Sequence, residues 1–495
     1  MPSSTPGEAA DVVIANALVV DGTGAPGAQG DVVVVGDRIS QVLSPRSGHP
    51  AVTVIDGTGM VLAPGFIDVH THDDWALLLA PDHRCKTLQG VTSVVTGNCG
   101  TSPFPQSSPG VKGGFDGGFA RYRHYAEALE EAGPSVNVAA LVGHGAIREM
   151  VVGLRANRRA DQAEMAEMAR LLEVALDDGV VGMSSGLAYE PGRYADITEL
   201  AELNRMVAAA GGVYTTHMRD EADGLLAAID EALEVARTAG VRLQISHLKA
   251  AGANNWGKVV EAMEKIAEAR ALGVEVLVDQ YPYTRGSTIL EQVVRSGALD
   301  GPSPFGHLTP QQVLIAAAPR HPEWEGHTVA EIAANAGEDP RAMANEIVVA
   351  EGRGCVVVVD MMDEQDIQTV LTDHHTLIGS DGIPAGEKAH PRLGHTFPRV
   401  LGRYQRDLGI LELPEIVHRM TLRSAQWFGL VDRGKITPGA YADLVLFDPA
   451  TIGDTGTYTE PDTPPTGVVH VWVNGRQVVE RGAPTSNRSG RVLLR

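Results

Sequence analysis

Apolar runs in this chain follow two different patterns. Near both ends, short stretches rich in Val and Ile are broken by Gly and Asp clusters, as in DVVIANALVV before DGTGAPGAQG and in GAYADLVLFD later on. β-Branched runs bounded by Gly and Asp predict short strands joined by tight turns. We therefore predict a small β-sandwich domain that is discontinuous in sequence, with one half in residues 1–61 and the other in residues 431–495.

Between these ends, residues 62–430 alternate strand-like runs with helical ones. The stretch 196–210 places Leu200 and Leu203 on one helical stripe, and Asp196 fits the start of a capping box. The strand-like VYTTHM follows it, and helical patterns return at 224–240 and 256–273. A βα unit that repeats about every thirty residues predicts a parallel sheet.

Eight strand candidates occur in this middle region, which fits an α/β fold with a (β/α)8 TIM-like barrel. The number of strands alone is equally compatible with an open α/β sheet, which is the alternative fold. The stretch between Tyr281 and His375 is too long for one βα connection and is rich in proline, so we predict an inserted subdomain or lid at 286–345. The eight candidates read LAPGFIDVH, VTSVVTGN, VNVAALVGHG, VVGMSSG, VYTTHM, RLQISH, VEVLVDQYP and HTLIGSDG.

Composition narrows the functional class. The chain has 495 residues with Lys+Arg 40 against Asp+Glu 62, a net charge of −22, which argues against nucleic-acid or anionic-membrane partners. No apolar run reaches the ~18 residues of a membrane span. The start MPSSTPGEAADVV lacks the basic and apolar regions of a signal peptide. Three cysteines form no disulfide framework, so we expect a soluble cytoplasmic protein with a small-molecule substrate.

The motif GFIDVHTHDDW ends an apolar strand with two histidines. Side chains at positions i and i+2 of a strand share a face, so His70 and His72 are placed to bind one metal ion. Taken alone, this motif has a simpler interpretation, in which the two histidines only pack and form hydrogen bonds at the end of a strand and bind no metal.

The other predicted strands also end in polar residues. Because so many polar strand ends are improbable by chance, they favour metal binding over simple packing of His70 and His72. The carboxyl ends of barrel strands meet at one rim, where active sites lie. Cys99 alone is also compatible with a buried thiol, Asp381 alone with an Asp-Gly turn, and His144 equally with packing or substrate contact. As a set, the pattern predicts a metal site with the ligands His70, His72, Cys99, His217 and His247.

Imidazole, thiolate and carboxylate together favour Zn²⁺. Zinc lowers the pKa of a bound water from 15.7 toward ~7 and so supplies hydroxide at neutral pH. Asp381, at the end of the eighth strand candidate, is then placed to accept the proton and pass it to a leaving amine. The predicted reaction is amide hydrolysis, with Asp381 as the catalytic residue.

Several motifs together resemble the N-acyl-D-amino-acid deacylases, or D-aminoacylases, of the metal-dependent amidohydrolases. They span most of the barrel region and read PGFIDVHTHDD, GVTSVVTGNCG, THMRDE, SHLKAAG, DQYPYTRGST, IGSDG and HPRLGHTFPRVLGRY. The resemblance implies zinc-dependent hydrolysis of N-acyl-D-amino acids to a carboxylate and a free D-amino acid. The preference for the D enantiomer rests on the resemblance alone.

The resemblance also implies roles for single residues. It assigns one tight zinc to Cys99, His217 and His247, and a weaker second metal position to His70, His72 and Asp381. Many amidohydrolases bridge two metals with a lysine after the fourth strand, but GVVGMSSGL contains none, so Cys99 is expected to bridge. The resemblance assigns the substrate carboxylate to Lys249, Tyr281 and Arg392. Ser287 is a weaker candidate for the same role, and His144 is a weaker candidate for substrate contact.

Two alternatives stay open at this point. One is hydrolysis of a cyclic amide or of another acylated amine in the same barrel, and the other is a scaffold that kept the fold without catalysis.

Overall fold

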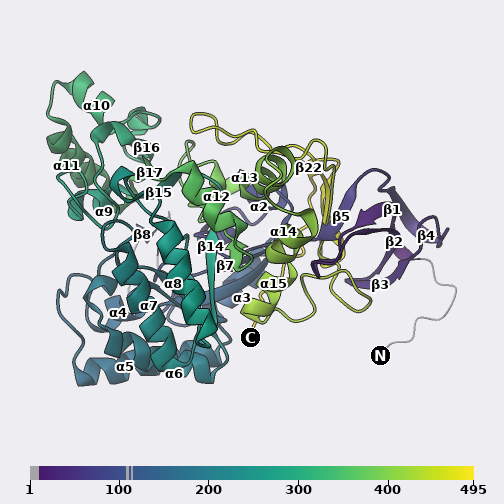
Figure 1. Ribbon diagram of the computed structural model, residues 1–495, viewed down its shortest axis with the longest axis horizontal. Helices are drawn as coiled ribbons and strands as arrows, with labels where there is room; N and C mark the ends of the chain where they lie inside the picture. Colours follow the sequence, from purple (N-terminus) through teal and green to yellow (C-terminus); the bar gives the residue numbers. More distant parts are fainter. Residues whose placement is uncertain (1–9, 107–110, 113–114, 117) are drawn as a thin grey trace.

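A computed structural model describes residues 10–106, 111–112, 115–116 and 118–495. Figure 1 shows a central barrel with its helices, a small subdomain that carries α10 and α11 at one end, and a β-domain with β1–β4 at the other end. The first and last parts of the chain both contribute strands to the β-domain.

The barrel consists of eight parallel strands arranged in chain order. Each of the eight predicted runs contains one of them, which confirms the predicted (β/α)8 class. The isolated parallel bridge between Thr71 and Gly382 joins the first and last members of the set and nearly closes the barrel. The strands are β6 (Phe66–Asp68), β7 (Val91–Thr96), β10 (Asn137–Gly143), β11 (Gly182–Gly186), β12 (Val213–His217), β13 (Arg242–Ile245), β14 (Val276–Gln280) and β18 (Thr376–Ile378).

Side chains alternate between the barrel interior and the surrounding helices. Ile67, Val95 and Leu141 belong to one buried apolar cluster, whereas their neighbours Phe66 and Val94 belong to another that includes the helices. This alternation follows from the two-residue period of a strand. Because both faces of the strands are covered, every residue of these eight strands except Arg242 is buried.

Helices cover the outside of the barrel, and none of those described is long and apolar enough to cross a bilayer. The predicted helix at 196–210 is α6 (Ile197–Ala209), and the Asp196 carboxylate accepts a hydrogen bond from the Glu199 N–H. The others are α1 (Ala76–Leu79), α2 (Arg84–Thr87), α3 (Tyr122–Ala132), α4 (His144–Val151), α5 (Gln162–Asp177), α7 (Leu225–Ala239), α8 (Val259–Ala271), α12 (Glu364–Thr372), α13 (Arg392–Arg399), which continues into a π-helix (Val400–Asp407), α14 (Leu413–Met420) and α15 (Leu422–Phe428).

The β-domain is a nine-stranded sheet made from both ends of the chain. Its two halves join where β5 (Val61–Pro64) pairs antiparallel with β19 (Leu444–Phe447). Side chains from both halves, among them Ile14, Leu62 and Trp472, form one buried cluster. The remaining strands are β1 (Ala10–Val19), β2 (Ala28–Val35), β3 (Arg38–Leu43), β4 (Ala51–Asp56), β20 (Val468–Val473), β21 (Arg476–Glu480) and β22 (Ala483–Pro484); a separate hairpin pairs β8 (Val111–Lys112) with β9 (Phe115–Asp116).

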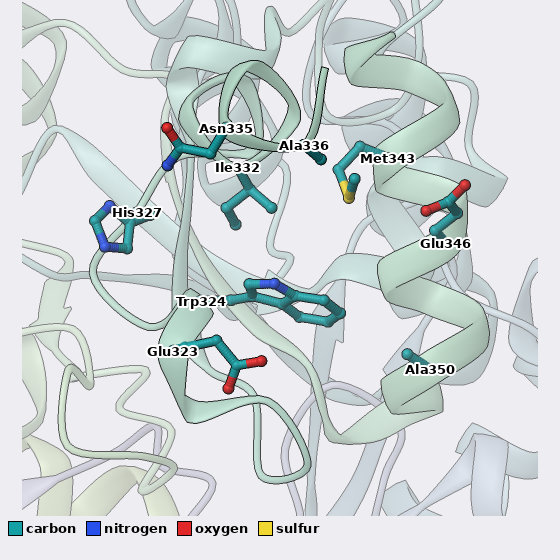
Figure 2. Close-up of a pocket in the computed structure, with 9 residues that line it drawn as sticks. All are labelled: Glu323, Trp324, His327, Ile332, Asn335, Ala336, Met343, Glu346 and Ala350. Atoms are coloured by element: carbon teal, nitrogen blue, oxygen red, sulfur yellow. The ribbon is translucent and has the colours of Figure 1, made fainter. Parts of the chain in front are cut away.

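The insertion between the seventh and eighth barrel strands has its own three-stranded antiparallel sheet and its own core. The sequence pattern placed the end of the insertion at residue 345, but the last strand of the insertion, β17 (Val356–Asp360), lies beyond that residue. A cleft of about 560 Å³ lies in this subdomain. Figure 2 shows the residues that line it, with the Trp324 side chain between Glu323 and Ile332. The elements are β15 (Arg285–Ile289), α9 (Leu290–Arg295), β16 (Val313–Ala317), α10 (Val329–Ala336), α11 (Pro340–Glu351) and β17 (Val356–Asp360).

Short 3₁₀ turns connect several of these elements. They lie at η1 (Gly192–Tyr194), η2 (Ala253–Asn255), η3 (Pro310–Gln312), η4 (Pro322–Trp324) and η5 (Gly352–Gly354).

A buried polar cluster joins the β-domain to the amino end of the third barrel strand. Asp443 forms an ion pair with Arg433, accepts the Asn474 N–H at 2.7 Å and accepts from Asn137 Nδ2 at 3.2 Å. Asp443 is 5% exposed and Arg433 is 3% exposed. Burial of these charges is tolerated because each is paired and hydrogen-bonded.

We predict that Asp443→Ala destabilises the protein by about 3–5 kcal/mol, because it leaves the Arg433 guanidinium buried without its carboxylate. Chemical denaturation followed by circular dichroism measures the change. Glu234→Ala, which removes an exposed carboxylate paired with Arg237, serves as the control and is expected to change the stability little. Equal losses in the two variants would contradict the role given to Asp443.

Candidate metal centre

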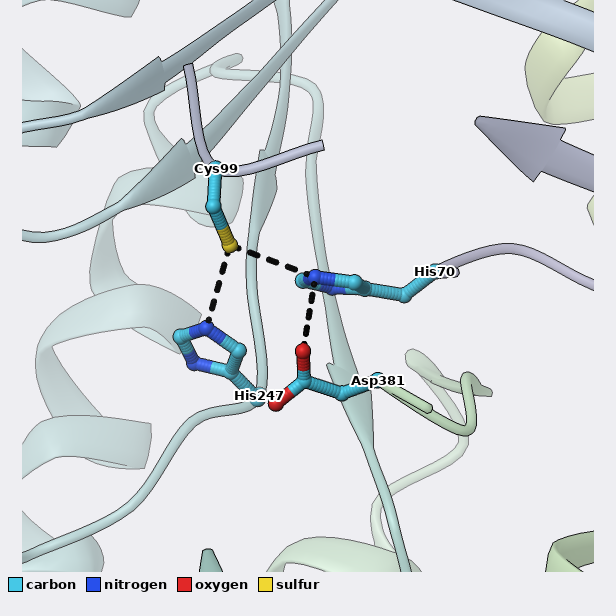
Figure 3. Close-up of side chains that lie close together, drawn as sticks. All are labelled: His70, Cys99, His247 and Asp381. Atoms are coloured by element: carbon cyan, nitrogen blue, oxygen red, sulfur yellow. Dashed lines mark hydrogen bonds and ion pairs between the residues drawn. The ribbon is translucent and has the colours of Figure 1, made fainter. Parts of the chain in front are cut away.

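Four side chains from four barrel strands meet at the carboxyl rim (Figure 3). Cys99 Sγ lies 3.3 Å from His70 Nε2 and 3.5 Å from His247 Nε2. Asp381 Oδ1 lies 3.3 Å from His70 Nε2. All four are buried, and one ligand atom from each lies within 4.8 Å of the others. The fold thus brings together predicted site residues as far apart in sequence as His70 and Asp381, which are 311 positions apart (381 − 70).

Backbone geometry at the rim is unusual. Cys99, His247 and Asp381 have φ values of 52°, 35° and 49°, in the left-handed region that non-glycine residues rarely adopt. The glycines on either side of Asn98-Cys99 make this bend sterically accessible. A Cβ on Gly97 would lie 2.0 Å from the Leu141 carbonyl oxygen, and one on Gly100 would lie 2.6 Å from the Gly186 nitrogen. The Gly-Asn-Cys-Gly sequence therefore lets the thiol reach the rim.

His72 and His217 complete the predicted ligand set. His72 Nε2 lies 3.0 Å from Asp381 Oδ1. The His217 ring stands edge-on to the His247 ring at a centroid distance of 4.6 Å, and His217 Nε2 lies 3.6 Å from Glu221 Oε2. The site therefore has one side with Cys99 and the rings of His217 and His247, and another with His70, His72 and Asp381.

Two carboxylates that sequence analysis missed orient the imidazoles. Asp279, in the middle of β14, lies 3.2 Å from His70 Nδ1 and accepts the His247 N–H at 2.8 Å. Glu221 Oε1 lies 2.9 Å from His247 Nδ1. A carboxylate at Nδ1 leaves Nε2 free to bind a metal, an arrangement common around metal-bound histidines. The run VEVLVDQYP contains two charged residues, Glu275 and Asp279, and a carboxylate directly after the apolar residues 276–278 was the available signal for Asp279.

The chemistry of the donor set fits a zinc ion. Burial alone would raise the pKa of the Cys99 thiol, but the positive charge of His70 and hydrogen bonds from the surrounding imidazoles lower that pKa well below its usual value. The thiolate is the form that binds metal. Among the described residues, neither ring nitrogen of the buried His217 has a hydrogen-bond partner. A metal ion bound to one of them would satisfy that nitrogen.

The predicted carboxylate-binding residues lie next to this cluster but are already partly paired. Lys249 Nζ is 2.8 Å from Glu221 Oε1. Arg392 Nη1 is 2.9 Å from Asp381 Oδ2, and its guanidinium stacks 4.4 Å above the Tyr281 ring. Lys249 and Arg392 are each at most 5% exposed. Each cation therefore balances a buried carboxylate of the centre in addition to any role toward substrate.

The two weaker candidates differ in position. Ser287 is adjacent to the cluster through its carbonyl oxygen, which lies 3.4 Å from Arg392 Nη2, and its hydroxyl has no hydrogen-bond partner among the described residues. His144 instead bonds to Glu199 Oε1 at 2.8 Å, an oxygen that Arg148 Nε also contacts at 2.9 Å. A substrate role for His144 stays a prediction.

Comparison with known proteins gives a consistent result. A family model described as "Amidohydrolase family" matches residues 53–479. The D-aminoacylase of Alcaligenes xylosoxydans xylosoxydans is 40% identical over 496 residues, which cover 98% of each chain. The N-acyl-D-glutamate deacylase of Bordetella bronchiseptica, solved with zinc and a phosphonate inhibitor that mimics the tetrahedral intermediate, superposes with a TM-score of 0.90 at 38% identity, over 99% of this chain and 100% of that one.

A solved D-aminoacylase with a binuclear metal centre has the same TM-score of 0.90 at 41% identity, and the match covers 98% of this chain and 100% of that chain. The family expected from the sequence motifs is therefore confirmed.

We predict that Asp279→Asn lowers the affinity for zinc about ten- to a hundredfold, because it removes the negative charge beside the His70 ring and replaces Oδ2, which accepts from Gln244 Nε2 at 2.6 Å, with an NH₂ donor. Competition with a chromophoric chelator measures the affinity. Asp366→Asn, which changes a buried carboxylate bonded to the Gly257 N–H, is the control and should bind zinc as the unmodified protein does. Unchanged zinc affinity in Asp279→Asn would rule out the orienting role.

Proposed function

This chain belongs to the amidohydrolase family, and we propose that it is a zinc-dependent hydrolase that converts N-acyl-D-amino acids to a carboxylate and a free D-amino acid. The observation that carries the proposal is the cluster of Cys99, His247, His70 and Asp381 within 4.8 Å, in a chain that is similar over almost its full length to D-amino-acid deacylases. The sequence motifs led to the same expectation.

The ligand assignment follows the two sides of the cluster. Cys99, His217 and His247 would hold the tight zinc, and His70, His72 and Asp381 would hold a weaker second metal, with the Cys99 thiolate between them. When bound, zinc supplies a Lewis acid and lowers the pKa of a coordinated water. The contacts of Cys99 Sγ with both His70 and His247 support its place between the two sides.

Asp381 is proposed as the catalytic residue. Its Oδ1 faces the rings of His70 and His72, whereas its Oδ2 is held by Arg392 at 2.9 Å. In this arrangement the Arg392 pair fixes the orientation of the carboxylate and leaves Oδ1 toward the centre. Oδ1 is therefore the atom that takes a proton from the nucleophilic water and returns it to the leaving nitrogen.

Arg392, Lys249, Tyr281 and Ser287 are proposed to bind the free carboxylate of the substrate. Arg392 Nε and the Ser287 hydroxyl are buried, and among the described residues neither has a hydrogen-bond partner. Buried donors without acceptors are costly, and a substrate carboxylate would supply acceptors to both of them at once. The guanidinium fork suits a carboxylate because it can donate two parallel hydrogen bonds.

We also propose a cytoplasmic location. Cys85, Cys99 and Cys355 are all free thiols, which suits a reducing compartment.

We predict that the protein hydrolyses N-acetyl-D-amino acids much faster than the L forms and faster than hydantoins, and that a chelator abolishes this activity until zinc is added back. Release of free amino acid over a panel of substrates, measured together with metal content, checks both parts. Activity on cyclic amides alone, or full activity without metal, would reject the proposal.

We predict that Asp381→Asn keeps the tight zinc but lowers kcat about 10²- to 10⁴-fold, because the amide cannot act as the proton acceptor. Metal analysis and steady-state kinetics measure the two properties. Asp373→Asn, at a partly exposed carboxylate before β18, is the matched control and should behave as the unmodified protein. A turnover close to that of the unmodified enzyme would refute the role of Asp381.

A further inference from the structure

Lys86 is a fully buried cation beside the place where the barrel closes. It lies on α2, and its ammonium group is 2.8 Å from Asp68 Oδ2, 2.8 Å from Ser380 Oγ and 3.4 Å from Asp73 Oδ2. His83 also contacts Asp73, at 3.1 Å. A buried lysine is costly unless it is paired, so these contacts fix its position firmly.

The residues that Lys86 contacts belong to the two strands that meet at this place. Asp68 is the last residue of β6, and its Oδ1 accepts the Ser380 N–H at 2.8 Å and the His70 N–H at 3.3 Å. Ser380 follows β18, and its hydroxyl oxygen accepts the Gly382 N–H at 3.1 Å. The Lys86–Asp68 pair therefore holds the chain just before Asp381 against the chain just before His70.

The next residues in both strands are those of the proposed active site. The Asp381 N–H donates to the His70 carbonyl at 2.7 Å, and the His72 N–H donates to the Gly382 carbonyl at 3.1 Å. Asp381 has a φ of 49°, a conformation that must be imposed by its surroundings. Its neighbour Ser380 is bonded through both its N–H and its hydroxyl, which supplies that restraint.

The other side of the centre is held by different groups. Asp279 and Glu221 orient His247, and Glu221 is balanced by Lys249. None of these contacts involves Lys86, Asp68 or Ser380. The side with Cys99, His217 and His247 therefore has supports that do not depend on Lys86, although Asp279 also contacts His70 Nδ1 at 3.2 Å on the other side.

We propose that Lys86 is a positioning residue for Asp381: through Asp68 and Ser380 it sets the register of β18 against β6 and so places the Asp381 carboxylate beside His70 and His72. The inference rests on the proposed catalytic function of Asp381. Lys86 itself does not touch substrate or metal. Its loss should disturb the side of the centre with Asp381 and spare the side with Cys99, His217 and His247.

The test compares variants of the full chain, each of which changes one contact between Lys86 and the segment that carries Asp381. Ser380→Ala removes the hydroxyl between Lys86 and the backbone, and Lys86→Met removes the charge. Lys86→Arg restores a cation at the same place. Ser246→Ala is the matched control, because Ser246 stands one residue before His247 as Ser380 stands before Asp381, is equally buried, and has a hydroxyl without a partner among the described residues.

We expect Ser380→Ala and Lys86→Met to lower kcat about ten- to a hundredfold, as displacement of a reacting group does, with a much smaller change in KM. Each variant should keep one tightly bound zinc. When the one-zinc forms of these two variants are titrated with Co²⁺, the second metal equivalent should bind about tenfold more weakly than in the unmodified protein. The reason is that the residues that position its ligands His70, His72 and Asp381 are lost. Lys86→Arg should recover part of both losses, and Ser246→Ala should change neither.

Loss of the tight zinc in proportion to activity would overturn the proposal, because Lys86 would then merely stabilise the fold. Unchanged kcat and Co²⁺ binding in Ser380→Ala would overturn it too, and that variant decides the matter if Lys86→Met does not fold. If the unmodified protein hydrolyses none of the acylated amino acids, the proposed function fails by itself. The Co²⁺ titration then still decides whether Lys86 supports the side with Asp381.

Discussion

Closure of the barrel between β6 and β18 is the constraint on which the site depends. The two strands are short, and their contact is completed by the residues that follow them, through the Asp381–His70 and His72–Gly382 backbone hydrogen bonds. Those same residues carry the metal-binding and acidic side chains. A closed parallel barrel brings the carboxyl ends of all its strands to one rim, so ligands far apart in sequence become neighbours in space.

Buried charge is the second organising feature of the site. Asp381 is balanced by Arg392, Glu221 by Lys249, and Asp68 by Lys86. Each pair is desolvated and would be unstable with one partner missing. The chain carries a net charge of −22, yet it gathers three cations around this centre. Burial raises the pKa values of Asp381 and Glu221, but the neighbouring positive charges, Arg392 and Lys249 among them, lower both pKa values below their usual range, so these two carboxylates are ionised in the protein interior.

Much of this could be predicted from sequence because it depends on local patterns. The eight strands were visible as apolar runs, and Cys99, His217, His247 and Asp381 were visible as polar residues at their ends. Asp279 and Glu221 were missed, since their importance comes from contacts across strands. The pairing of Lys249 with Glu221 was missed for the same reason. The strand β17 lies past the predicted end of the insertion because it pairs with β15 and β16, a long-range choice that no local pattern encodes.

The pairing of β5 with β19 has a consequence for biosynthesis. β1 to β5 leave the ribosome before the barrel segment, whereas β19 to β22 of the same sheet follow it. Pairings between distant segments form slowly, and unpaired strand edges invite aggregation. The β-domain must therefore stay incomplete during translation until the segment that forms the barrel has been synthesised.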